Sequence, residues 1–305
     1  MVSADEARAE LLRHLKTLDY RFIAVTPTTH ATVLARRPPA TLSLRDIFGW
    51  NRPFAGSDLS PPLLTLLDAG DALDSRDGML RSKLRVASLG GDLLFHGGFP
   101  TDDVDAVFFG PDTYRFARFI EQQLPRIGAA DWLVDMGAGC GAGAIAAARL
   151  RPFGKITMVD VNDGALRLAA INASVADVRA ETMQADALPG GADLIIANPP
   201  YMIDASGRSY RDGGDLLGGA VALAWTRQFL GQPAPGATML LYTGAAVVGG
   251  QAPLLDRLAR ECADVGASLE WDEIDPDVLG DELERPQYGT VERIAVIGAV
   301  IRSAK

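Results

Sequence analysis

The chain has 305 residues, 48% hydrophobic and 22% charged, a balance that is typical of a globular protein and excludes a disordered, collagen-like or low-complexity one. Its length indicates two domains, and its formal charge of −10 disfavours nucleic acid as a partner because a phosphate backbone would repel it. Two cysteines exclude a disulfide framework and a Cys-rich zinc site, and we expect no bound metal. The acidic start and the lack of a long apolar run predict a cytoplasmic protein without a signal peptide or a membrane span.

The first hundred residues predict a small mixed domain, which we place at residues 1–108. Ser3 and Glu6 have the spacing of a capping box, which marks the start of an amphipathic helix. Two apolar segments around Gly90-Gly91 are typical of a β-hairpin. The predicted elements are a helix over 4–18, a short helix over 63–73 and a hairpin over 84–95. Prolines interrupt residues 21–62, so no long element is predicted there.

After residue 109 short apolar strands alternate with helices, which predicts a doubly wound, Rossmann-like α/β domain over 109–305. The predicted strands are 132–136, 155–159, 183–188, 193–197, 237–243, 268–274 and 291–301, and the helices are 142–150, 164–173, 220–230 and 253–265. The last two strands leave no room for a helix between them, so we expect a seven-stranded sheet that ends in an antiparallel pair. Ligands of such sheets bind beyond the carboxyl ends of the strands.

A glycine-rich loop follows the first strand of this domain. It runs from Asp135 to Gly141, where glycines allow a tight turn and bring backbone N–H groups against a ligand. Asp160 closes the second strand, where a carboxylate can hold both hydroxyls of a ribose. Asp186 closes the third, within reach of an adenine amino group. Glycines at alternate positions, with Asp135 two residues ahead of the first, indicate an adenosyl ligand without a pyrophosphate.

The fourth strand runs straight into the sequence Asn198-Pro199-Pro200-Tyr201. With the glycine loop upstream, this segment resembles the motif of class I S-adenosylmethionine-dependent methyltransferases of the amino-methylating type. Over residues 109–305 the chain is most similar to release-factor glutamine methyltransferases and their uncharacterised bacterial relatives. Phe109 to Thr113 resembles the Pro-x-x-Asp/Glu-Thr segment of these enzymes, and Tyr210 to Asp215 resembles the Gly-Gly-x-Asp-Gly stretch that follows their motif.

This resemblance implies S-adenosyl-L-methionine as cofactor and an amide or amino nitrogen as methyl acceptor, with a protein glutamine side chain as the best candidate. The implied donor-binding residues are Phe109, Pro111, Thr113, Asp135, Gly137, Ala138, Gly139, Asp160, Val161, Asp186, Ala187 and Asn198. The implied catalytic residues are Asn198, Pro199, Pro200 and Tyr201. It also implies that the N-terminal domain selects the substrate.

The chemistry explains these residue types. The lone pair of a planar amide or aniline-like nitrogen is delocalised, so the nitrogen is a poor nucleophile. Two acceptors, the Asn198 side-chain oxygen and the Pro199 carbonyl, would bond its N–H groups and favour a pyramidal nitrogen that faces the methyl group. Proline at 199 and 200 holds those carbonyls rigidly, and Tyr201 would stack on the planar group.

Other functions stay open. The same motif serves exocyclic amines of adenine and guanine. Arg36, Arg37, Arg45 and Arg52 against the single Asp46 give residues 36–52 a local charge of +3. A small-molecule acceptor and a non-catalytic adenosyl-binding subunit are further alternatives, although an amine-orienting motif argues against the last. Residues 20–105 do not match the helical N-terminal region of release-factor enzymes. Residues 210–215 are either a lid over the acceptor or a surface turn. The sequence does not indicate an oligomeric state.

Overall fold

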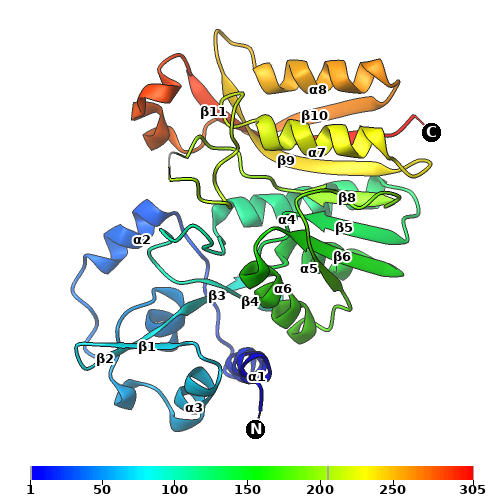
Figure 1. Ribbon diagram of the computed structural model, residues 1–305. Coiled ribbons are helices and arrows are strands. Elements are labelled where there is room, and N and C mark those ends of the chain that lie inside the picture. Colours follow the sequence, from blue (N-terminus) through cyan, green and yellow to red (C-terminus); the bar gives the residue numbers. More distant parts are fainter. Residues whose placement is uncertain (1, 205, 305) are drawn as a thin grey trace.

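The computed structural model describes residues 2–204 and 206–304 (Figure 1). Its N-terminal region contains three helices and two small hairpins. They are α1 (Ala4–Thr17), α2 (Pro27–Leu34), α3 (Pro61–Ala69), β1 (Leu73–Arg76) paired with β2 (Met79–Ser82), and β3 (Leu84–Leu89) paired with β4 (Asp92–Gly97). Arg45–Gly49 forms a π-helical turn and Gly56–Asp58 a single 3-10 turn. All of these pack beside one end of the main sheet.

The predicted elements of this region are confirmed with shifted ends. Ser3 and Glu6 form the expected capping box, and α1 ends one residue before the predicted end. The second predicted helix was too long at its carboxyl end, because Gly70 ends α3 and the chain has already turned into β1 at Leu73. The sequence missed α2 and the hairpin of β1 and β2. Both consist of short, mostly exposed segments, in which no apolar periodicity can develop.

The second half forms the predicted seven-stranded sheet. Its strands are β5 (Trp132–Met136), β6 (Lys155–Asp160), β7 (Glu181–Gln184), β8 (Leu194–Ala197), β9 (Thr238–Val247), β10 (Ser268–Asp275) and β11 (Arg293–Arg302), in the order β10-β11-β9-β8-β5-β6-β7. β5 to β9 run parallel, and β11 pairs antiparallel with both β9 and β10. The Rossmann-like fold with an antiparallel C-terminal pair is therefore confirmed.

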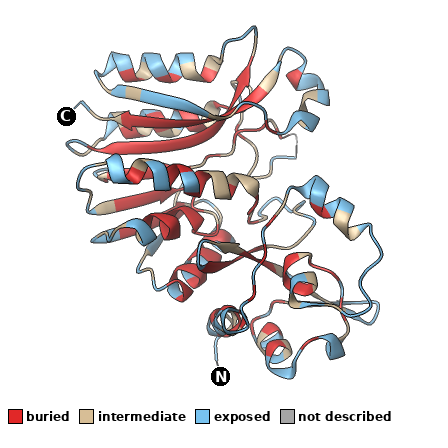
Figure 2. Ribbon diagram, turned by 180° about the vertical axis from the view of Figure 1, so that it is seen from behind, coloured by how far each residue is buried: buried red, intermediate tan, exposed pale blue. Residues whose placement is uncertain are grey.

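Helices cover both faces of the sheet. They are α4 (Pro111–Gln123), α5 (Ala142–Leu150), α6 (Asp163–Val175), α7 (Ala220–Gly231) and α8 (Pro253–Asp264). Alternate strand residues face opposite layers: Leu133 packs with α4, α5 and α6, and Val134 packs with α7 and α8. The central strands are buried on both faces, as Figure 2 shows. This burial explains why they read as continuous apolar runs in the sequence.

Two details of the sheet differ from the prediction. β7 ends at Gln184 instead of residue 188, and its four residues are exposed, so no burial signal marked its ends. Asp186 consequently lies two residues beyond the strand that we expected it to close. The connection between β10 and β11 holds two 3-10 helices, Gly280–Glu284 and Pro286–Tyr288, where the prediction left no room for a helix.

The N-terminal region and the sheet share one apolar core. α1 and β4 both contact α6, and a single cluster of buried side chains runs from Leu11 of α1 to Val300 of β11. The division at residue 108 therefore stays a prediction. His30 and His96 are buried in this region, where burial lowers the pKa of both imidazoles and keeps them neutral. Within the described residues, every helix is too short or too polar to cross a bilayer.

Candidate functional site

A cavity of about 720 Å³ opens at the carboxyl ends of β5, β6 and β8. This volume lies in the range of small-molecule sites, and the place is the one expected for a ligand of an open α/β sheet. The sequence-predicted residues that line it are Pro111, Thr113, Asp135, Gly137, Ala138, Gly139, Asp160, Val161, Asp186, Asn198, Pro199, Pro200 and Tyr201. The structure thus brings together almost all of the predicted site.

Two predicted donor-binding residues lie outside the lining. Phe109 is 1% exposed and stacks on the ring of His96, with ring centroids 5.3 Å apart, so it supports the core behind the cavity. Ala187 is exposed. It lies three residues beyond the end of β7 and directly follows Asp186, which does line the cavity.

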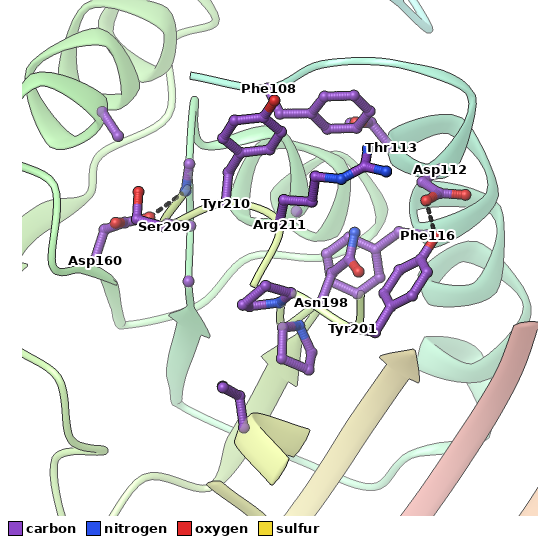
Figure 3. Close-up of a pocket in the computed structure, with 18 of the residues that line it drawn as sticks. Phe108, Asp112, Thr113, Phe116, Asp160, Asn198, Tyr201, Ser209, Tyr210 and Arg211 are labelled. Carbon is purple, nitrogen blue, oxygen red and sulfur yellow. Dashed lines mark hydrogen bonds between the residues drawn. The ribbon is translucent and has the colours of Figure 1, made fainter. Parts of the chain in front are cut away.

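The glycine loop lies against the end of β6. The N–H groups of Gly137 and Ala138 both donate to the carbonyl of Val159, at 2.8 and 2.9 Å. The N–H of Gly139 donates to the Asp160 carboxylate at 2.8 Å, which joins the loop to the predicted ribose ligand. Figure 3 shows this bond at the donor end of the cavity.

Two carboxyl groups, those of Asp135 and Asp160, lie at the end of the cavity that is predicted to hold the donor. Asp135 is 1% exposed, and burial raises its pKa to about 7 although it accepts a bond from Ala144 N–H at 2.7 Å. Burial also raises the pKa of Asp160, while bonds from Asn162 N–H and Gly139 N–H lower it. A nearby positive charge stabilises the ionised form of a buried carboxyl group. The sulfonium and ammonium groups of S-adenosylmethionine carry such a charge.

The Asn-Pro-Pro-Tyr segment forms a rigid turn at the end of β8. In Figure 3 the side chain of Asn198 lies within the cavity. Among the residues that the structure describes, no hydrogen-bond partner is found for its amide. An amide held beside two prolines and left without a protein partner is free to bond a ligand.

Tyr201 is anchored from behind. Its hydroxyl donates to Asp112, as drawn in Figure 3, and Tyr242 donates to the same carboxylate at 3.2 Å. Arg115 pairs with Asp112 at 3.3 Å and with Asp275 of β10 at 2.9 Å. No sequence motif marks this anchor, which ties the N-terminus of α4 to the turn. The predicted stacking of Tyr201 on an acceptor stays a prediction.

Residues 211–219 pack directly on the back of the turn. Met202 N–H donates to Arg211 C=O at 3.0 Å, and Gly213 N–H donates to Met202 C=O at 2.7 Å. A Cβ at Gly213 would lie 2.7 Å from Pro200 O and 1.9 Å from Gly218 O. The segment is therefore no free surface turn. Ser209 to Asp212 line the cavity, while Gly213 and Gly218 press the backbone against the turn.

Several lining residues were missed by the sequence analysis. Phe108 and Tyr210 form a parallel pair over the cavity, with ring centroids 5.7 Å apart, and the Tyr210 hydroxyl bonds Thr101 C=O at 2.7 Å. Further missed residues lie at the start of α2, in α7 and in the connection after β10, and they include Thr26, Pro27, Trp225, Gln228, Asp277, Val278 and Leu279. They carry no motif and reach the cavity only through tertiary structure. A sequence signal existed for Tyr210, Arg211 and Asp212, which line the cavity and lie in the stretch that the resemblance singled out.

The lining of the cavity is acidic. It contains the two basic residues Arg115 and Arg211. Its acidic residues are Asp112, Asp135, Asp160, Asp186, Asp212 and Asp277. This balance favours a cationic ligand and opposes entry of a phosphate chain. No group of three or more His, Cys, Asp or Glu that could hold a metal ion occurs in residues 2–204 and 206–304.

Known methyltransferases are similar to this chain in sequence. The family model described as methyltransferase small domain matches residues 113–211. Release factor glutamine methyltransferase of Deinococcus radiodurans is 26% identical over 270 residues, which cover 85% of this chain and 93% of that protein. The corresponding enzyme of Mycolicibacterium smegmatis is 38% identical over 27% of this chain and 31% of its own length.

Other matches are shorter or show only the fold. Ribosomal RNA large subunit methyltransferase G of Vibrio vulnificus is 33% identical over 31% of this chain and 27% of its own length. The crystal structure of Trm5b from Pyrococcus abyssi aligns with a TM-score of 0.50 at 16% identity, over 76% of this chain. The alignment covers 62% of that protein, so this chain spans less than two thirds of it.

Proposed function

Because this chain is a class I S-adenosylmethionine-dependent methyltransferase, homologous over most of its length to release factor glutamine methyltransferases, we propose that it methylates the side-chain amide of a protein glutamine. The observation that carries the proposal is the unpartnered amide of Asn198, held in a Pro-Pro turn beside a carboxylate-lined pocket. Residues 1–108 select the acceptor, and Thr26 and Pro27 of this region reach the cavity.

The chain's own residues act by orientation. S-adenosylmethionine supplies a methyl group on a sulfonium, which is already a good leaving group. Asp160 holds the ribose, and Asp135 lies where a carboxylate can meet positive charge. Asn198 Oδ1 and Pro199 O accept the two N–H groups of the amide and turn its lone pair toward the methyl carbon. These fixed dipoles also stabilise the positive charge that develops on the nitrogen.

A glutamine acceptor is favoured over a nucleic-acid base by charge. The cavity lining is acidic. Of the four arginines that suggested a basic platform, Arg52 is buried and bonded within the protein, whereas Arg36, Arg37 and Arg45 are exposed. Arg52 is 8% exposed and donates to Val33 C=O at 2.9 Å, and Arg85 is 4% exposed and donates to Gly97 C=O at 2.8 Å. Arg81 donates to Asn51 C=O at 3.0 Å.

Both cysteines are buried free thiols, which suits a reducing, cytoplasmic compartment.

The acceptor class is tested with labelled donor. A cell extract is incubated with the purified chain and methyl-labelled S-adenosylmethionine, then digested separately with protease and with nuclease. We expect protease to solubilise the label and tandem mass spectrometry to find it on a glutamine side chain. Label that survives protease and is released by nuclease would reject the protein acceptor in favour of a base. Extract treated with the Asn198→Ala variant is the matched control, and the label that the variant adds should be at most about one hundredth of that added by the unaltered chain.

A further inference from the structure

Asn172 joins two parts of the chain from outside the cavity. It lies on the inner face of α6 and is fully buried. Its Oδ1 accepts the N–H of Phe95 at 2.9 Å, and its Nδ2 donates to the carbonyls of Phe95 at 3.0 Å and Cys140 at 2.9 Å. One amide thus pairs with the backbone of β4 as a neighbouring strand would, and also holds a carbonyl of the glycine loop.

Both groups that Asn172 holds are connected to the cavity, Cys140 as part of its lining and Phe95 through neighbouring residues. Cys140 follows Gly139, whose N–H bonds the Asp160 carboxylate, so the Cys140 carbonyl fixes the loop on the side away from the ligand. Phe95 precedes His96, whose ring stacks on Phe109. Phe109 lies two residues before Pro111, the first residue of α4 and part of the cavity lining. The hairpin of β3 and β4 belongs to the region that we assign to acceptor selection.

We propose that Asn172 is a positioning residue that fixes the glycine loop for donor binding and couples donor binding to the β3–β4 hairpin. Without it, three buried backbone groups lose their partners, and the loop carbonyl can turn toward the interior or the cavity. The loop N–H groups then no longer keep one orientation. Coupling of this kind is reciprocal, so an occupied donor site also steadies the hairpin. The inference concerns the donor and holds for any methyl acceptor.

Asp92 supplies a matched control. It lies on the same strand β4 and forms a two-pronged ion pair with Arg149 of α5, at 2.6 and 2.7 Å. This pair fastens the hairpin to the sheet domain without touching the glycine loop. A change at Asp92 therefore loosens the same junction and leaves the Cys140 carbonyl held.

The first experiment is calorimetric titration with S-adenosylhomocysteine. We expect Asn172→Ala to weaken binding about tenfold, because roughly one net hydrogen bond of loop stabilisation is lost, and Asp92→Ala to bind within about twofold of the unaltered chain. Both variants should have a lower melting temperature than the unaltered chain. Melting temperature alone therefore does not distinguish loss of loop positioning from loss of a hairpin contact. Equal affinities of Asn172→Ala and the unaltered chain would overturn the proposal.

The second experiment needs no substitution, so it tests the coupling between the donor site and the β3–β4 hairpin even if Asn172→Ala fails to fold. Hydrogen exchange of the unaltered chain is compared with and without saturating S-adenosylhomocysteine. We expect the Phe95 amide, which bonds Asn172, to exchange several-fold more slowly when the site is filled. The Ser88 amide bonds Phe22 C=O on the opposite edge of the hairpin and should not change. No slowing at Phe95 with the site filled would contradict the coupling. This outcome is independent of the glutamine assay.

Discussion

At the scale of single residues, the proposed function divides the site into groups that would hold the donor and groups that would orient the acceptor. Asp135 and Asp160 lie at the donor end, and Asn198 faces the cavity from the turn after β8. Because these groups act in different steps, their substitutions should have different kinetic consequences.

Asn198→Ala should lower kcat by about 10²- to 10³-fold, since one of two acceptors that orient the nitrogen is lost. The dissociation constant for S-adenosylmethionine should change less than about threefold. Single-turnover kinetics and calorimetry measure the two quantities. Full turnover in the variant would remove Asn198 from the mechanism.

Asp135 makes the stability of the free protein depend on pH. Its pKa is about 7 in the folded chain and near 3.8 when unfolded. Between these values the folded state binds the extra proton, so stability falls as pH rises toward and through 7. The unaltered chain should therefore lose on the order of 2 kcal/mol more stability than Asp135→Asn between pH 5 and pH 8. Denaturant unfolding at both pH values measures the difference, and equal losses would show that Asp135 ionises normally.

At the scale of elements, the Asn-Pro-Pro-Tyr turn is held by neighbouring segments that belong to no single sequence motif. The glycine loop and the Asn-Pro-Pro-Tyr turn were predicted because each directly follows a buried strand, where sequence pattern and fold agree. The contact of Asp112 with Tyr201 joins segments 89 residues apart in the chain, and the contact of Gly213 with Pro200 forms where the chain folds back on the turn. Nothing in the local sequence encodes such contacts, so they came only from the structure.

Gly213→Ala should displace the turn, because its Cβ would overlap the carbonyls of Pro200 and Gly218. We expect kcat to fall at least tenfold while donor affinity stays within about threefold. Gly128→Ala is the control, since a Cβ there meets nothing within 4 Å and should leave kcat unchanged. A Gly213→Ala variant as active as Gly128→Ala would show that the turn does not need this support.

At the scale of the whole molecule, the seven-stranded sheet and its antiparallel C-terminal pair followed from the alternation of strands and helices, whereas the order of the strands came from the structure. The N-terminal region did not follow from such a pattern, because prolines and short exposed segments hide α2 and the hairpin of β1 and β2 from any periodicity. The contacts between this region and the sheet domain could not be predicted either, because the residues that make them have the pattern of any amphipathic element.

Because one apolar core spans residue 108, a fragment of residues 109–305 should be unstable. Removing α1 and β4 uncovers the face of α6 on which they pack. We expect the fragment to aggregate or to unfold without a sharp thermal transition, measured by light scattering and circular dichroism. A monomeric fragment that melts cooperatively and binds donor normally would instead establish two independent domains.

The most direct test of the mechanism is a crystal structure with S-adenosylhomocysteine. The account predicts the ribose hydroxyls within hydrogen-bond distance of the Asp160 carboxylate and the sulfur beside the cavity face of Asn198. In that arrangement a nitrogen bonded to Asn198 and Pro199 lies in line with the transferred methyl group. Density for the thioether on the far side of the cavity from Asn198, or outside the cavity, would contradict the proposed catalysis.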